Sequence, residues 1–452
     1  MALKRVFVAN RGEIALRVVR AAQKLGIETV VGVSDADRGS AAARAATRTV
    51  VLGPGPAAKS YLDPELVVHA ARETGCDGLH PGYGFLSERP ILPRLCAANG
   101  IAFVGPEADT IEALGDKISA RAMARAAGVP LVPGSDHIAS AADAVSVAQD
   151  IGYPVLLKAS AGGGGRGMII AHSNGEVEAG FATASAEAES AFGDGTMFLE
   201  RFVPRARHVE VQLIGDGRGK VVHFGERDCS VQRRYQKLIE EAPSAAMPEG
   251  LRRQLHESAV ALAASVQYRS AGTVEFLYDV DRAEIYFIEV NARIQVEHPV
   301  SEEVSGHDLV GWQLRLAGGE PLDLTQADIS ISGHAIECRI NAEDWRRGFI
   351  PSPGSISRWD PPTGSGIRLD THMTEGATIP PYYDSMIGKL IVTGKDRAEA
   401  IERLEAALAD FQVEGVPTTI GLHQAIVAHP DFRANRFHTR WLEQTLLPEL
   451  EL

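Results

Sequence analysis

The sequence is poor in cysteine. Its 452 residues include four, Cys76, Cys96, Cys229 and Cys338, and no two of them form a C-x-x-C pair. This spacing argues against a structural zinc site and against a disulfide scaffold. The N-terminal stretch "MALKRVFVAN" enters a strand-like run directly and shows no signal-peptide pattern. We therefore expect a cytoplasmic protein with reduced thiols.

Long apolar runs and an excess of basic residues are also missing. No apolar run approaches the roughly 18–20 residues needed to cross a bilayer, so we expect no membrane association. The chain has 45 Lys and Arg against 59 Asp and Glu, which gives a net charge of −14. Nucleic-acid binding depends largely on basic surface, so the composition disfavours it. A small anion needs only a local positive pocket and is not excluded.

The N-terminal part alternates strand-like and helix-like segments. "RVFVA", "EIALRVVRAAQKLG" and "ETVVGVS" predict strand, helix and strand, and a second such round follows. This pattern predicts a doubly wound parallel sheet over residues 1 to about 105. A nicotinamide-dependent dehydrogenase would have G-x-G-x-x-G after the first strand, but "ANRGEIA" carries one of the three glycines. The length, too great for one core, predicts two or three lobes.

A run of four glycines stands out in "LLKASAGGGGRGMII", residues 156–170. Glycine runs usually form linkers. This one lies between two strand-like runs of a segment rich in small residues, about 130–203, so we interpret it as a hairpin loop within one small lobe. Glycine lets backbone N–H groups approach phosphate oxygens, and Lys158 precedes the run. The Walker pattern G-x-x-x-x-G-K-[ST] is absent.

Two polar clusters could carry chemistry. In "FIEVNARIQVEHPVSEEVSG", strand alternation places five polar side chains on one face: Glu289, Asn291, Arg293, Gln295 and Glu297. Together with Glu275 of "GTVEF", this set suits Mg²⁺ better than it suits an exposed strand edge. In "ERDCSVQRRYQKLIEEAPS", three cations, Arg233, Arg234 and Lys237, form either a solvated loop or an anion pocket.

These stretches together resemble the biotin carboxylase component of biotin-dependent carboxylases, an ATP-grasp enzyme. The motifs, in order, are "NRGEIA", "HPGYGFLSE", "KASAGGGGRGM", "RDCSVQRRYQK", "EEAPS", "GTVEF", "FIEVNARIQVEHPVSE", "CRINAED", "PSPG" and "YYDSMIGKL". The resemblance implies a multidomain α/β and α+β fold. Its parts would be an N-terminal domain at 1–115, an ATP-grasp region at 116–318 with a lid lobe at about 131–203, and a C-terminal domain at 334–442.

The resemblance also implies roles for single residues. The nucleotide would contact Lys117, Lys158, Gly164, Gly165, the segment Glu200, Arg201, Phe202 and Val203, and His208. Tyr235 stands where the family often has a histidine, so we count it as a further nucleotide contact that departs from the pattern. The metal would bind Glu275, Glu289 and Asn291. Bicarbonate would bind Lys237, Arg293 and the backbone of Val296, with Glu297 as the general base and Arg339 facing biotin.

The implied reaction is the ATP-dependent carboxylation of biotin by bicarbonate, with Mg²⁺ or Mn²⁺ as the metal. None of the seven methionines precedes a lysine, and biotin acceptor domains carry a Met-Lys pair. We therefore expect biotin in trans on a biotin carboxyl carrier protein, carboxyltransferase subunits as further partners, and a homodimer by analogy. The alternatives are another ATP-grasp carboxylate ligase and a catalytically silent assembly subunit.

Overall fold

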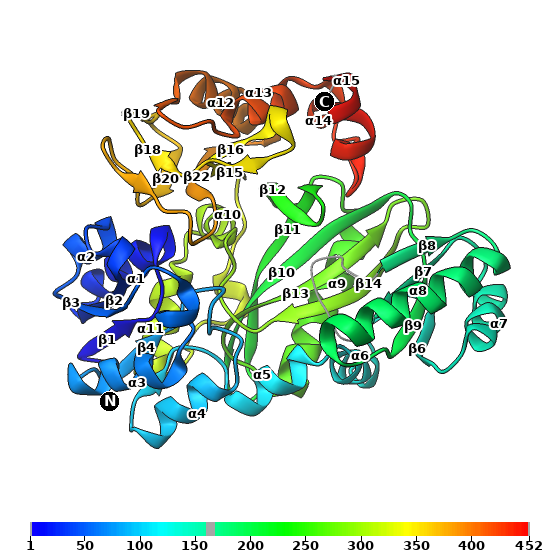
Figure 1. The fold of residues 1–452 in the computed structure, drawn as a ribbon, viewed down its shortest axis with the longest axis horizontal. Helices are drawn as coiled ribbons and strands as arrows, with labels where there is room; N and C mark the ends of the chain where they lie inside the picture. The colour runs from blue at the N-terminus through cyan, green and yellow to red at the C-terminus, as the bar shows by residue number, and fades with distance from the viewer. Residues whose placement is uncertain (1, 160–167, 451–452) are drawn as a thin grey trace.

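The structure is a computed structural model that describes residues 2–159 and 168–450. A parallel five-stranded sheet forms its N-terminal part, in the order β3-β2-β1-β4-β5 (Figure 1). Its strands are β1 (Arg5–Val8), β2 (Glu28–Ser34), β3 (Arg48–Gly53), β4 (Gly78–His80) and β5 (Ala102–Phe103). Its helices are α1 (Gly12–Lys24), α2 (Ala41–Ala45), α3 (Pro64–Glu73) and α4 (Ile91–Ala98). The predicted doubly wound parallel sheet is confirmed.

A small lobe carries a second sheet, in the order β6-β9-β7-β8. Its elements are β6 (Gly134–Ile138), α7 (Ala141–Ile151), β7 (Val155–Ala159), β8 (Met168–Ala171), α8 (Asn174–Phe192) and β9 (Met197–Arg201). Strands β7 and β8 are antiparallel neighbours, as expected for the strands that flank the glycine run. The run itself, with Gly164 and Gly165, lies outside the described residues.

An eight-stranded antiparallel sheet runs through the middle of the molecule, in the order β14-β13-β10-β11-β12-β15-β22-β20 (Figure 1). Its strands are β10 (Ala206–Asp216), β11 (Val221–Arg233), β12 (Gln236–Ala242), β13 (Arg269–Asp279), β14 (Glu284–Asn291), β15 (His334–Asn341), β20 (Ile367–Thr371) and β22 (Met386–Gly394). Strand β12 pairs with β15, so strands after residue 334 extend the central sheet. The sequence does not predict this pairing, because cross-strand packing rather than local pattern decides it.

Helices complete the central and C-terminal parts. Those of the central part are α5 (Ala108–Gly115), α6 (Lys117–Ala126), α9 (Glu249–Ser265), α10 (His298–Ser305) and α11 (Leu309–Ala317). Those of the C-terminal part are α12 (Arg397–Asp410), α13 (Ile420–Ala428), α14 (Pro430–Arg433) and α15 (Leu447–Glu449). The apolar face of α12 packs against β15 and β22. The short strands of the C-terminal part are β16 (Glu343–Asp344), β17 (Ile350–Pro351), β18 (Gly354–Ser355), β19 (Arg358–Asp360), β21 (Thr378–Ile379) and β23 (Gln412–Glu414).

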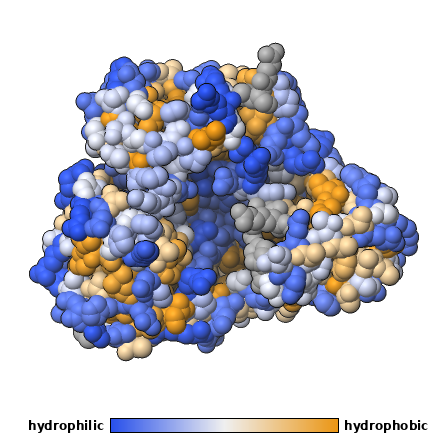
Figure 2. Space-filling view, in the orientation of Figure 1, coloured by the Kyte–Doolittle hydropathy of each residue, from blue (hydrophilic) through white to orange (hydrophobic). Residues whose placement is uncertain are grey.

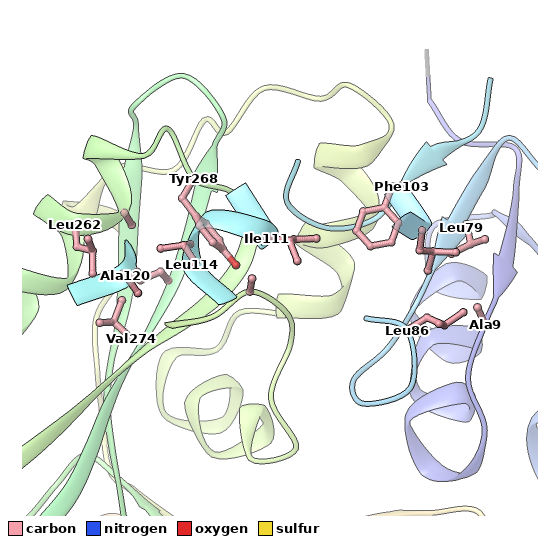
Figure 3. Packing of buried hydrophobic residues seen from close by; sticks show 14 of the residues in the cluster. Ala9, Leu79, Leu86, Phe103, Ile111, Leu114, Ala120, Leu262, Tyr268 and Val274 are labelled. Atoms are coloured by element: carbon pink, nitrogen blue, oxygen red, sulfur yellow. The ribbon is translucent and has the colours of Figure 1, made fainter. Parts of the chain in front are cut away.

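One apolar core joins the N-terminal sheet to the central sheet. It runs from Leu79 and Phe103 through Ile111 and Leu114 of α5 to Val274 on β13 (Figure 3). Because protein interiors are close-packed, this shared core fixes the two sheets relative to each other.

A cleft of about 1400 Å³ opens between the three parts. Figure 2 shows it as a hollow with a hydrophilic lining. Its lining includes Glu13 of the N-terminal part, Lys158 of the small lobe, Lys237 of the central sheet and Arg339 of the C-terminal part. Within residues 2–159 and 168–450, no helix is long and apolar enough to span a bilayer.

Candidate active site

Lys237 on β12 stands at the centre of the polar cleft. Its Nζ lies 2.5 Å from Glu210 Oε2, 2.9 Å from Glu275 Oε1 and 2.6 Å from Glu297 Oε1. Burial alone lowers the pKa of Lys237, but the three carboxylates outweigh it and raise that pKa well above its ordinary value. The ammonium is therefore a permanent positive charge.

Glu297 immediately precedes α10 and is fully buried. Its second oxygen, Oε2, accepts a hydrogen bond from Arg339 Nη2 at 3.0 Å. Burial raises the pKa of Glu297, but the opposite effect of the charges of Lys237, Arg339 and Arg227 is larger. The pKa of Glu297 therefore lies well below its ordinary value. The predicted base is thus an ionised carboxylate held by two cations of neighbouring strands.

Arg339 on β15 lies between two carboxylates. Its Nε donates to Glu240 Oε1 at 2.6 Å, while its Nη2 donates to Glu297. Burial raises the pKa of Glu240 to about 7, and the nearby charge of Glu297 adds to this effect. The bond to Glu240 fixes the guanidinium plane, so Arg339 keeps a set orientation in the cleft lining.

Arg293 follows the end of β14 and is held from three sides. Its guanidinium donates to Glu88 Oε2 at 2.8 Å, to Asn291 Oδ1 at 2.8 Å and to Gln295 Oε1 at 2.9 Å. Its partners Asn291 and Gln295 each also donate to Glu275. Four residues of the face predicted from strand alternation, Asn291, Arg293, Gln295 and Glu297, are therefore joined in one network through Glu275 and Lys237, although the strand itself ends at Asn291.

The predicted metal ligands lie on adjacent strands. Glu275 on β13 is directly opposite Glu289 on β14, and Asn291 Nδ2 donates to Glu275 Oε1 at 2.9 Å. Burial and the charge of Glu275 raise the pKa of Glu289, whereas Lys237 and His208 hold the pKa of Glu275 well below its ordinary value. Hard oxygen ligands of this kind fit Mg²⁺ once the amide of Asn291 turns its oxygen toward the pair.

Two further groups of side chains are close enough to chelate an ion: His208, Glu210 and Glu275, and Glu210, Cys229 and Glu297. The Lys237 ammonium contacts both carboxylates of each group, whereas of the pair Glu275 and Glu289 it contacts Glu275. A second cation is therefore repelled more strongly at these groups than beside Glu289. His208 Nε2 instead lies 2.8 Å from Glu275 Oε2, which places this predicted nucleotide contact beside the carboxylate pair.

The predicted nucleotide residues that the structure describes all line the cleft. Lys158 on β7 forms an ion pair with Glu200 on β9 at 2.5 Å. Lys117 is the first residue of α6, and burial lowers its pKa. The charges of Glu289 and Glu200 act in the opposite direction, and the charge of Lys158 lowers the pKa as burial does. Arg201, Phe202 and Val203 follow Glu200 along the same wall. Two lysines near a carboxylate pair are the side-chain types that can bind phosphates and a metal together.

The cations of the basic cluster, residues 233–237, have different surroundings. Lys237 points into the buried carboxylates, whereas Arg233 stacks 3.9 Å above the ring of Phe349. Arg234 and Tyr235 form the turn between β11 and β12 with φ of 46° and 65°, and Tyr235 is 60% exposed at the cleft edge. Cys229 is fully buried, as expected.

Sequence reasoning missed several partners that hold the residues of the cleft. Glu210 is fully buried, Glu240 and Glu88 hold the two arginines, and Lys389 donates to the carbonyl of Val296. A signal existed for Glu210, because alternation in "RHVEVQ" puts it on the same face as His208. The others depend on tertiary contacts between distant strands and loops.

Comparisons with known proteins agree along the chain. Residues 2–111 match the family "Biotin carboxylase, N-terminal domain", residues 116–325 match "Carbamoyl-phosphate synthase L chain, ATP binding domain", and residues 337–444 match "Biotin carboxylase C-terminal domain". Biotin carboxylase 1 of Bacillus subtilis is 47% identical over 442 residues, 98% of each chain.

Two solved structures have the same fold over the whole chain. The biotin carboxylase domain dimer of 2-oxoglutarate carboxylase from Hydrogenobacter thermophilus, in complex with MgADP, ADP and bicarbonate, is 46% identical, with a TM-score of 0.93. The match covers 100% of this chain and 99% of the chain in that structure. The biotin carboxylase subunit of a pyruvate carboxylase is 45% identical over 99% of each chain, with a TM-score of 0.87. The chain belongs to the biotin carboxylase family of ATP-dependent ligases.

Proposed function

We propose that this protein carboxylates biotin with bicarbonate and ATP, giving carboxybiotin, ADP and phosphate. The observation that carries the proposal is the position of Lys237 between Glu297, Glu210 and Glu275, with Arg293 and Arg339 in the same cleft. Cations arranged around one ionised carboxylate can hold a small anion while the carboxylate takes its proton. The solved relative with bicarbonate, MgADP and ADP supports this choice of ligands.

Glu297 acts as the general base. Bicarbonate bound by Lys237, Arg293 and the Val296 backbone gives its proton to the Glu297 carboxylate, and its oxygen attacks the γ-phosphorus of ATP. The product, carboxyphosphate, breaks down to CO₂ and phosphate. Arg293 has a fixed orientation from Glu88, Asn291 and Gln295, so it can hold the anion without reorganising.

Lys117 and Lys158 bind the phosphates of ATP, and Glu275, Glu289 and Asn291 hold Mg²⁺. The metal supplies charge neutralisation on the transferring phosphoryl group, where catalysis is mostly positioning and electrostatics. Glu200 keeps the Lys158 ammonium at the cleft wall through their ion pair. His208, the segment from Glu200 to Val203, and Tyr235 at the cleft edge complete the nucleotide site, and the glycine loop with Gly164 and Gly165 is proposed to cover the phosphates.

Arg339 faces biotin. The ureido nitrogen of biotin must lose its proton before it attacks CO₂, and the negative charge then rests largely on the ureido oxygen. Arg339 stabilises that oxygen, and its bond to Glu240 keeps the guanidinium in place. Because Arg339 also contacts Glu297, the biotin site and the bicarbonate site share this residue.

The relatives include a subunit of a larger carboxylase and a domain solved as a dimer. We propose that this chain likewise receives biotin on a separate carrier protein, works with carboxyltransferase subunits and forms a homodimer. The division into domains at 1–115, 116–318 and 334–442, with the lid at about 131–203, and the cytoplasmic location also remain proposals.

The test is ADP release by the purified protein with ATP, Mg²⁺ and bicarbonate, with and without free biotin. Release that needs bicarbonate and rises with biotin is the expected result. ATP cleavage that needs an amine acceptor instead would favour another ATP-grasp ligase. An absence of nucleotide binding, measured by calorimetry, would refute the proposal in favour of a silent role in assembly.

A further inference from the structure

The segment Gln295–Glu297 carries both the Glu297 carboxylate and the Val296 peptide, and a donor holds each of its three carbonyl oxygens. The carbonyl of Gln295 accepts a hydrogen bond from His298, and the carbonyl of Glu297 accepts one from the Val300 N–H, both in the first turn of α10. The middle carbonyl, that of Val296, accepts a hydrogen bond from Lys389 Nζ at 2.8 Å. Lys389 lies on β22, so this donor reaches the segment from the C-terminal part of the chain.

Lys389 and Arg339 are adjacent on one face of the sheet. They are direct cross-strand partners on β22 and β15, and directly opposite residues of an antiparallel pair point to the same side. Arg339 contacts the side chain of Glu297, and Lys389 contacts the main chain of the preceding residue. Two neighbouring cations therefore hold two consecutive residues of the proposed bicarbonate site.

The Lys389 ammonium is completely buried, which is unfavourable for a charge. Its ionic partner is Glu13 on α1, at 3.1 Å, and the carboxyls of Glu337 and Asp370 also act on it. A buried ion pair is commonly no more stabilising than an apolar pair of the same volume. Stability alone is therefore a weak reason for a lysine here, whereas an apolar residue could not hold the Val296 carbonyl.

We propose that Lys389 is a positioning residue for bicarbonate. By fixing the Val296 carbonyl, it sets the plane of the peptide between Val296 and Glu297, and so the direction in which the segment presents this peptide and the Glu297 carboxylate to the anion. This inference rests on the proposed function, because it assumes that bicarbonate binds beside Val296 and Glu297.

The test compares two variants that differ only at Lys389. Glu13→Gln removes the ion pair and leaves the hydrogen bond from Lys389 to Val296. Lys389→Met with Glu13→Gln removes both, and its neutral pair avoids leaving an unpaired buried carboxylate at Glu13, which protects folding. Relative to Glu13→Gln, the double variant should have a bicarbonate KM raised about ten- to a hundredfold, the range for a lost charged hydrogen bond. The KM for ATP should stay the same in both.

A bicarbonate KM equal in the two variants would overturn the inference. So would an equal rise in the KM for ATP, because that would indicate general disruption. Thermal unfolding of both variants checks that each is folded, and Lys389→Arg, which keeps a cationic donor, should have a smaller effect than Lys389→Met; an equal effect would count against the inference. If the unmodified protein shows no bicarbonate-dependent ADP release, the proposed function fails before the variants are compared.

Discussion

Replacing Glu297 with glutamine tests the central assignment. Glutamine keeps the side-chain volume and one acceptor oxygen but cannot take a proton from bicarbonate. Loss of a general base costs roughly 10²–10⁴-fold in rate, or about 3–5 kcal/mol of transition-state stabilisation. Lys237 keeps its contacts with Glu210 and Glu275, so its ammonium stays neutralised. The glutamine oxygen can accept from one of the two cationic donors, Lys237 or Arg339, and its NH2 group then faces the other, so the free energy of unfolding should fall by about 2 kcal/mol.

The assay is bicarbonate-dependent ADP release, with nucleotide affinity measured separately by calorimetry. Glu241→Gln is the matched control. Like Glu297, Glu241 is buried and paired with an arginine, but it lies on β12 outside the cleft lining, and its partner is Arg397. We expect Glu297→Gln to bind ATP normally with turnover reduced by orders of magnitude, and Glu241→Gln to lose stability but keep turnover. Normal turnover in Glu297→Gln, or an equal loss in the control, would refute the assignment of the base.

Two further changes test separate parts of the site, and the control variant Glu241→Gln tests a pKa shift outside it. Arg339→Ala should reduce biotin carboxylation more than bicarbonate-dependent ATP cleavage, and equal losses in the two assays would exclude the role proposed for it at the ureido oxygen. Glu289→Gln should raise the Mg²⁺ concentration needed for half-maximal ADP release, and an unchanged Mg²⁺ titration would remove Glu289 from the metal site. Arg397 and His334 offset the burial of Glu241 and lower its pKa to about 2, below the ordinary value of 4.5. Its contribution of about 3 kcal/mol is thus complete above pH 4.5 and is lost as the pH falls toward 2. Urea unfolding at pH 7 and pH 3.5 should show a smaller loss in Glu241→Gln than in the unmodified protein, and equal losses would contradict the pKa shift.

Local patterns predicted the elements that depend on neighbouring residues. The N-terminal parallel sheet follows from alternating strand and helix periodicity, and the pairing of β7 with β8 follows from the hairpin interpretation of the glycine run. The polar face from Glu289 to Glu297 follows from strand alternation as far as Asn291, where β14 ends. Beyond that residue the side chains converge because Glu88 and Glu275 hold them, not because the backbone stays extended.

Contacts between distant segments could not be predicted in the same way. Lys389 lies in the strand-like stretch "MIGKL", where a lone lysine indicates an exposed position. Its burial results from the pairing of β22 with β15, which places it between Glu13 and Val296. The division of the basic cluster has a similar cause, since Lys237 alone points toward the three carboxylates. Charge in the sequence indicated an anion site but not which cation faces it.

The charges around Lys237 explain how a carboxylate with a low pKa can act as a base. Before substrate binds, Lys237 and Arg339 hold Glu297 ionised, so no proton blocks it. An arriving bicarbonate adds a negative charge beside Glu297 and shares the field of Lys237, which raises the pKa of the carboxylate. Its affinity for a proton therefore rises only when the proton donor is in place. A divalent cation at Glu275 and Glu289 would offset the added charge, so metal and bicarbonate should each favour binding of the other, as reciprocal linkage requires.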